Sequence, residues 1–118
     1  MPRSFNDLEI WKSAHKLTIL IYQESMTWPE SERYNLISQI RRAAVSVELL
    51  ISEGHSRYHN KDIIHFMHES RASAEEVRNC LMIARDLPHI PFGEKFELLN
   101  IQYIGLIKGI NAFINSLR

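Results

Sequence analysis

The sequence predicts an all-α fold: one domain, residues 1–118, built as an up-down-up-down antiparallel four-helix bundle with left-handed packing. The chain holds only four glycines and four prolines in 118 residues, so it offers few turns. Between these residues, apolar side chains recur at spacings of three and four, and no sustained alternation indicates a strand. Short links join the periodic segments, and antiparallel packing is the simplest arrangement of helices connected in this way.

The first expected helix covers residues 8–26. Asn6 is placed to cap it, and Glu9 three residues later would complete a capping box. Phe5 and Ile10 stand at the positions of a hydrophobic staple. Its core stripe is Ile10, Ala14, Leu17 and Ile21, and Leu8, Trp11 and Tyr22 widen the apolar face.

The second expected helix covers residues 31–53, and Gly54 stands where a glycine often ends a helix. Its core stripe alternates spacings of four and three: Leu36, Ile40, Ala43, Val47 and Leu50. A sustained repeat of about 3.5 residues predicts left-handed, coiled-coil-like packing.

The third and fourth expected helices cover residues 60–87 and 92–117, and Pro88 ends the third. The third has small residues at the centre of its stripe, which lets a neighbouring helix approach closely: Ile63, Met67, Ser70, Ala74, Val77, Leu81 and Ala84. The fourth keeps the same spacing with larger side chains: Phe92, Phe96, Leu99, Tyr103, Leu106, Ile110, Phe113 and Leu117.

The fourth helix also has a second apolar face. At about 100° per residue, one set of residues falls opposite the core stripe: Leu98, Ile101, Gly105, Gly109 and Ala112. Charged residues interrupt the segment, which excludes a membrane-spanning GxxxG helix. One interpretation is that the fourth helix packs at the centre of its own bundle, so that other helices of the same chain cover this second face. A subunit interface is favoured, because a bundle gives each helix one inward face and self-association is the commonest way to cover another.

A polar stripe runs along the second helix at the edge of its core face: Gln39, Arg42, Ser46 and Glu53. Three interpretations stay open, namely a hydrogen-bond network between helices or subunits, a ligand or nucleic-acid contact, and plain solvated surface. Because Arg42 precedes two alanines, we expect it to be partly buried and paired with a carboxylate from another helix or another subunit.

Residues 55–61 combine two cations, two histidines and a tyrosine, a composition that suits phosphate binding or base stacking. An ordinary polar loop is the alternative, and Glu53 and Asp62 beside it favour that alternative. The candidate nucleic-acid-binding residues, expected together near one end of the second and third helices, are Arg41, Arg42, Arg57 and Lys61.

Composition narrows the possible functions. Fourteen basic and fourteen acidic residues give a formal net charge of zero, which argues against a chain that coats DNA nonspecifically. A hydrophobic content of 45% argues against disorder. We expect no secretory signal and no transmembrane span. A single cysteine, Cys80, cannot form an internal disulfide, which fits the reducing cytoplasm.

No catalytic constellation stands out, so we expect no enzyme activity, cofactor, metal or small-molecule substrate. A ferritin-like di-metal site needs two Glu/Asp-x-x-His pairs on helices, and Asp62 with His65 supplies one within the expected helices. A surface metal on His65, His68 and Glu69 is disfavoured against plain helix surface. Cys80 flanks the core stripe and suits a small buried residue better than a nucleophile.

Several segments resemble the bacterial 23S rRNA intervening-sequence proteins, also called the S23 ribosomal protein family. They are residues 4–11 (SFNDLEIW), 28–36 (WPESERYNL), 38–47 (SQIRRAAVSV) and 52–57 (SEGHSR), with further matches at 66–67 and 72–76. The resemblance implies a helical bundle that assembles as a homopentamer in the bacterial cytoplasm. Some members are encoded within insertions in 23S rRNA genes, and distant relatives are accessory proteins of retroelements that engage nucleic acid.

The resemblance carries over to individual positions. Arg42, Ser46, Glu53 and Arg57 match the family pattern, whereas Leu50 stands where the family has an asparagine. We therefore expect a non-enzymatic, homo-oligomeric bundle that binds structured RNA or DNA and has no membrane partner. The alternative is a protein-interaction scaffold or accessory subunit without nucleic-acid binding.

Overall fold

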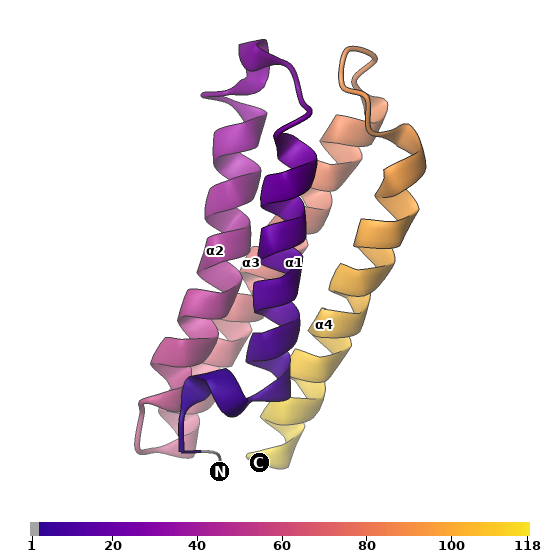
Figure 1. The fold of residues 1–118 in the computed structure, drawn as a ribbon. Coiled ribbons are helices and arrows are strands. Elements are labelled where there is room, and N and C mark those ends of the chain that lie inside the picture. The colour runs from indigo at the N-terminus through magenta and orange to yellow at the C-terminus, as the bar shows by residue number, and fades with distance from the viewer. Residues whose placement is uncertain (1–2) are drawn as a thin grey trace.

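The computed structural model describes residues 3–118, which fold into four α-helices with no strand among them (Figure 1). The helices are α1 (Glu9–Ser25), α2 (Leu36–His55), α3 (Asn60–Asp86) and α4 (Phe96–Ser116). Successive helices run in opposite directions, and the bundle measures 46 × 23 × 20 Å. The predicted all-α four-helix fold is confirmed. The first two positions of the expected domain lie outside the described residues.

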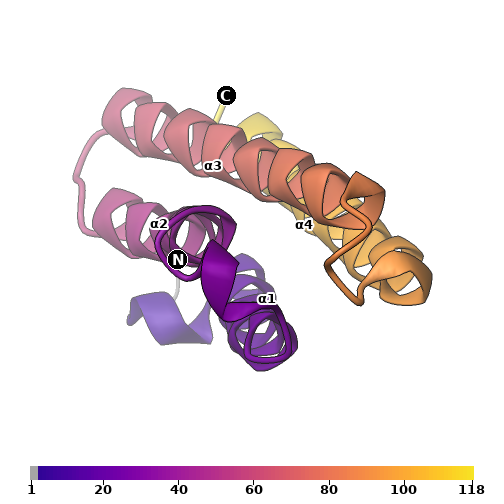
Figure 2. The ribbon, with the colours of Figure 1, turned by 90° about the horizontal axis from the view of Figure 1, so that it is seen from above.

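The helices do not pack equally closely. Helix α2 lies against both α1 and α3, whereas α4 lies mainly against α3 and more loosely against α1 (Figure 2). Helices α2 and α4 are diagonal neighbours across the bundle. Their outer surfaces therefore lie on opposite sides of the molecule.

The predicted core stripes are largely buried. Every stripe position of α3 is buried, and so are the first four of α2. Leu50, the fifth, is only half-buried, and Ile51 takes the deep position with no exposed surface. A straight α-helix repeats every 3.6 residues, so a stripe drawn at 3.5 drifts away from the core over several turns. On α1, Tyr22 is 40% exposed and lies outside the core.

Small residues bring α2 close to α3. The Ser70 hydroxyl donates to the Val47 carbonyl at 2.7 Å, and Ser70 and Ala74 are fully buried. A Cβ placed on Gly54 would lie 2.9 Å from Cβ of Phe66 and 2.7 Å from Cε of Met67. Gly54 is therefore required by a close helix contact, and its expected role as a helix-ending residue is wrong, because α2 continues to His55.

The start of α1 differs from the predicted cap. Residues Phe5–Asp7 form a 3₁₀ turn, and α1 begins at Glu9 with Leu8 as its N-cap and no side-chain capping bond. The predicted capping box on Asn6 is therefore wrong. Phe5 packs edge-on against Trp11, with ring centroids 5.2 Å apart, in place of the expected contact with Ile10. An aromatic contact thus sets how the chain enters the helix.

Helices α2 and α4 begin four or five residues later than predicted. Short 3₁₀ turns, Glu30–Glu32 and Gly93–Lys95, occupy the expected first turns of each. The two links lie side by side, because Trp28 packs edge-on against Phe92 with ring centroids 5.5 Å apart. His89 and Glu32 add a contact of 2.9 Å between the links. Tertiary packing at this end replaces the regular helical start.

No helix within residues 3–118 combines the length and apolar character needed to cross a bilayer.

We expect Gly54→Ala to lower the free energy of unfolding by about 1–3 kcal/mol, because the new methyl group must push α3 away. This loss outweighs the better helix propensity of alanine, worth about 1 kcal/mol. Urea unfolding followed by circular dichroism measures it.

The matched control is Gly93→Ala, since a Cβ there meets nothing within 4 Å. Its stability should stay within about 1 kcal/mol of the unsubstituted protein. Equal stability of the two variants would show that the α2–α3 contact has room for a side chain.

Candidate functional site

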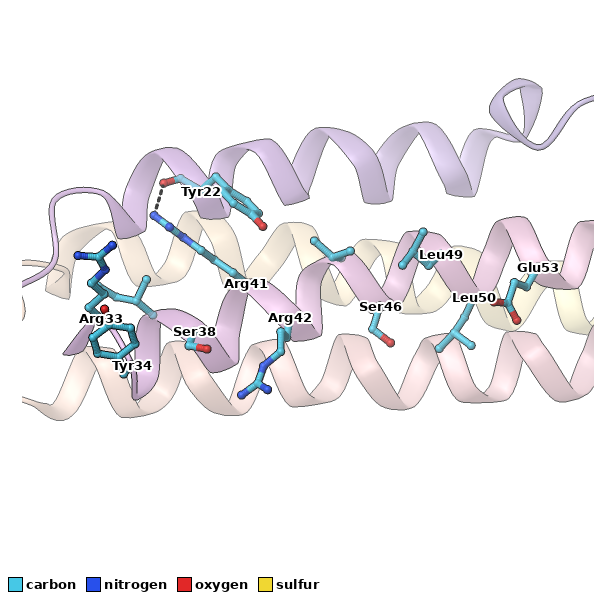
Figure 3. A pocket seen from close by; sticks show the side chains of 12 residues that line it. Tyr22, Arg33, Tyr34, Ser38, Arg41, Arg42, Ser46, Leu49, Leu50 and Glu53 are labelled. Atoms are coloured by element: carbon cyan, nitrogen blue, oxygen red, sulfur yellow. Dashed lines mark hydrogen bonds between the residues drawn. The ribbon is translucent and has the colours of Figure 1, made fainter. Parts of the chain in front are cut away.

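The outer surface of α2 carries an open groove of about 810 Å³, which we call the α2 groove (Figure 3). Its apolar lining includes Ile37, Val45, Leu49 and Leu50. Charged residues stand at both ends, with arginines toward the start of α2 and Glu53 toward its end. Because the opposite side of α2 supplies the core, this groove faces away from the bundle.

Arg41 is tied to α1. Its Nε donates to Oγ of Ser25 at 2.8 Å. Its Nη2 donates to the Tyr22 carbonyl at 3.4 Å, the dashed bond in Figure 3. The guanidinium also lies 4.7 Å from the centroid of the Tyr22 ring. A cation beside the last turn of α1 interacts favourably with the helix dipole. Arg41 thus fastens α2 to the end of α1.

The polar stripe divides into an internal and an external part. Ser46 shares a hydrogen bond of 3.0 Å with Ser73 of α3, as the network interpretation expects. Gln39, Arg42 and Glu53 are exposed. Arg42 has no ion pair among residues 3–118, so the expected partial burial and a carboxylate from another helix are wrong for the single chain. The reason is that Arg42 points away from the alanine-lined side of α2. A carboxylate from another subunit stays a prediction.

The four candidate cations do not form one patch. Arg41 and Arg42 lie in the second turn of α2, whereas Arg57 and Lys61 follow its other end. At 1.5 Å per residue, the helix from Arg42 to His55 alone separates the two groups by roughly 20 Å. The expectation that they gather near one end of α2 and α3 is wrong, since residues on one helix are separated by its length.

The α2–α3 turn and the C-terminal end of α4 lie at the same end of the bundle (Figure 1). The Arg57 guanidinium lies 4.6 Å from the Phe66 ring centroid, and Tyr58 is 96% exposed. Nδ2 of Asn60 donates to the Leu117 carbonyl at 3.0 Å, which places the exposed Arg118 at the end of the bundle where α3 begins. We call Arg57, Tyr58, Lys61 and Arg118 the turn patch. Sequence reasoning missed Arg118, because only the fold joins the chain end to this turn.

The second apolar face of α4 is largely uncovered within the chain. Leu98 and Ile101 are 64% and 61% exposed, and Gly105 and Ala112 are exposed as well. Gly109 differs, because a Cβ there would lie 3.4 Å from Cγ2 of Ile10. Gly109 therefore belongs to the α1–α4 contact inside the bundle. The subunit interface expected on this face stays a prediction.

The described residues hold no group of three or more His, Cys, Asp or Glu side chains placed to bind a metal. His68, part of the weighed surface cluster, contacts Nη2 of Arg71 through its Nδ1 at 2.8 Å. That arginine in turn donates to Oδ1 of Asn111 at 2.6 Å. His68 thus takes part in a contact between α3 and α4.

Cys80 is buried, with 1% of its surface exposed. Burial, helped by the nearby charge of Glu76, raises the pKa of its thiol to about 11. Only the thiolate is a strong nucleophile, so the thiol is held in its unreactive form at neutral pH. Its place in the core matches the predicted role of a small apolar residue.

Residues 6–112 match the model of a family described as 23S rRNA-intervening sequence protein. The matched range starts ahead of α1 and ends within α4, so it includes the α2 groove and the α2–α3 turn. A search of curated proteins finds no match. The family match confirms the resemblance that the sequence segments indicated.

We expect Arg41→Ala to lower the free energy of unfolding by about 1–2 kcal/mol, because it removes a charged hydrogen bond and a cation–π contact with α1. Urea denaturation measures the loss. Lys16→Ala, an exposed position on α1, is the control and should change stability by less than about 0.5 kcal/mol. Equal losses from both variants would contradict a fastening role for Arg41.

We expect Cys80 to make stability fall at alkaline pH. Folding favours the protonated thiol, so this contribution is complete below about pH 9 and is lost as the pH rises toward 11. Unfolding free energies measured from pH 8 to 11 should fall more steeply than those of Cys80→Ala. Parallel curves for the two proteins would contradict the raised pKa.

Proposed function

Because the chain belongs to the 23S rRNA-intervening sequence protein family, we propose that it is a non-enzymatic homo-oligomeric bundle, a pentamer, that binds structured RNA or DNA. The proposed contact is the turn patch at the end of the bundle. The proposal places the protein in the bacterial cytoplasm, as the resemblance implies. The family description names 23S rRNA, which makes an rRNA helix the first nucleic acid to test.

The main support for nucleic-acid binding is the set of exposed cations in the turn patch. Lys61 and Arg118 are exposed and form no ion pair within residues 3–118. Arg57 rests one face on Phe66, an arrangement that holds a guanidinium in place for a phosphate. Tyr58 exposes almost its whole ring, on which a base can stack.

Local structure adds to the attraction for phosphate. The α3 helix begins at Asn60 without a side-chain cap, so its first N–H groups add partial positive charge beside Lys61. Glu53 and Asp62 lie nearby and limit the long-range field. Individual phosphate contacts, more than overall charge, therefore support binding by a chain of zero net charge.

Symmetric assembly would strengthen a small patch. A pentamer presents the same patch five times, and linked contacts raise overall affinity without any new interaction. A structured nucleic acid with several phosphates at the right spacing can engage more than one copy. An assembly would therefore bind nucleic acid with higher overall affinity than a single turn patch.

A protein-interaction scaffold is the second candidate function. The open, partly apolar α2 groove favours it, since grooves beside a helix are a common way to hold a partner helix. In this case the bound partner would be protein, and nucleic acid would have no effect.

We expect a labelled rRNA stem-loop to bind at about 50 mM salt and to weaken steeply by about 200 mM, as phosphate contacts require. The double variant Arg57→Ala with Lys61→Ala should bind roughly tenfold more weakly, with a salt slope lower by about two. Fluorescence anisotropy against the stem-loop and a duplex DNA of equal length measures both quantities.

The control pair, Lys12→Ala with Lys16→Ala, removes two exposed cations from α1 and should leave binding unchanged. Circular dichroism checks that each variant is folded. A folded, assembled protein that binds neither probe at low salt would refute the nucleic-acid role and leave the scaffold.

A further inference from the structure

Two outer surfaces of the chain are uncovered. One is the α2 groove, whose most exposed aliphatic side chain, Leu49, is 55% exposed. The other, which we call the α4 face, consists of Glu97, Leu98, Ile101, Gly105 and Lys108, all exposed. Apolar side chains at this exposure, grouped on one helix face, are typical of interaction sites. The question is whether the two surfaces fit each other.

The charged residues of the two surfaces have the same spacing, but the positive and negative charges occur in opposite order along the two helices. On α2, Arg42 precedes Glu53 by eleven residues (53 − 42); on α4, Glu97 precedes Lys108 by eleven (108 − 97). Eleven residues span roughly 16 Å of helix and return to within about 20° of the same side. None of the four charges forms an ion pair elsewhere in residues 3–118.

This order distinguishes the two possible orientations. If α4 of one copy lies parallel to α2 of another, Arg42 meets Glu97 and Glu53 meets Lys108. If the helices are antiparallel, Arg42 faces Lys108 and Glu53 faces Glu97. Both contacts then bring like charges together, which destabilises an interface. Only the parallel orientation pairs all four.

The apolar residues agree with the same register. The alignment that pairs the charges sets Gly105 opposite Leu50 and next to Leu49. A Cβ at Gly105 would meet nothing within 4 Å, so this position leaves room for a leucine from a neighbour. Leu98 and Ile101 then lie alongside Val45 and Leu49, and apolar surface is buried on both helices.

The fold supplies the parallel orientation. Helices α2 and α4 run in the same direction within one chain and lie on opposite sides of the bundle (Figures 1 and 2). Rotation about an axis parallel to the bundle keeps their directions, so α4 of one copy meets α2 of the next in parallel. A contact between two different surfaces repeats from copy to copy and closes a ring when the rotation allows it.

We infer that the α4 face of one copy docks into the α2 groove of the next, in parallel, with ion pairs Arg42–Glu97 and Glu53–Lys108 across the interface. This inference rests on the homo-oligomer of the proposed function and names the surfaces that build it. Each chain uses one surface of each kind, so assembly continues beyond a dimer. The second copy is the occupant of the α2 groove.

Charge reversal tests the pairing. Arg42→Glu and Glu97→Arg should each raise the concentration at which the oligomer dissociates by at least about tenfold, because each sets like charges together. The double variant restores an opposite pair and should assemble nearly as the unsubstituted protein does. Analytical ultracentrifugation over a concentration series, without nucleic acid, measures all three.

Two matched reversals outside both surfaces are the controls: Lys16→Glu on α1 and Glu69→Arg on α3, both exposed. They should assemble normally. An unsubstituted protein that is monomeric or dimeric, single variants that assemble normally, or a double variant that stays dissociated would each overturn the inference. Thermal unfolding confirms that a dissociated variant remains folded.

A disulfide tests the register independently. Leu49→Cys with Gly105→Cys, in a Cys80→Ala background, places one thiol on each surface. These two positions lie on opposite sides of one chain, so a disulfide between them must join two copies. Oxidation should give a ladder of linked chains that ends at the full ring on a non-reducing gel. Chains that stay unlinked would contradict the register.

The proposed interface and the proposed nucleic-acid contact can be tested independently of each other. The Arg57→Ala and Lys61→Ala double variant should keep its assembly, because the turn patch lies at the end of the bundle. A ring that binds no nucleic acid would refute the binding role alone. A protein that binds nucleic acid as a monomer would refute the interface alone.

Discussion

The close packing of α2 against α3 is the constraint on which the rest of the molecule depends. Gly54 and Ser70 let the two helices approach until a serine hydroxyl reaches the opposite backbone. Thr18 makes a similar link, since its hydroxyl donates to the Ala44 carbonyl at 3.2 Å and fixes α1 on the other flank. Helices α1 and α3 therefore cover two sides of α2. The third side of α2 faces outward and carries the α2 groove. The uneven packing of the bundle thus leaves this groove open.

Cations in this protein serve different purposes according to which way they point. Arg41 turns toward α1, where it donates to Ser25, whereas its neighbour Arg42 points outward and is exposed. A single residue step along a helix rotates a side chain by about 100°, which is enough to separate the two roles. Arg57 and Lys61 lie at the α2–α3 turn, far along the bundle from Arg42. The proposed assembly surface and the proposed phosphate contact therefore use different residues of a chain with zero net charge.

The proposed assembly and the proposed nucleic-acid contact are connected through geometry. The proposed interface runs along the sides of the bundle, and the turn patch lies at its end. Copies arranged side by side would therefore present their turn patches on one face of the ring. This arrangement explains how a chain of zero net charge and a small cationic patch can offer a nucleic acid an extended surface. It also leaves the core, including the buried thiol of Cys80, outside the functional surfaces.

The helices, most residues of the core and the family could be predicted from the sequence, because apolar periodicity and the matched segments are local properties. The sequence also identified the second apolar face of α4 and the polar side of α2. The tertiary structure decided the rest. The fold placed Gly54 at a helix contact and moved the starts of α2 and α4 through the packing of Trp28 on Phe92. It also separated the four candidate cations, three arginines and one lysine, into two groups. It also brought Arg118 to the α2–α3 turn. These outcomes depend on contacts between residues distant in the chain, which no local pattern records.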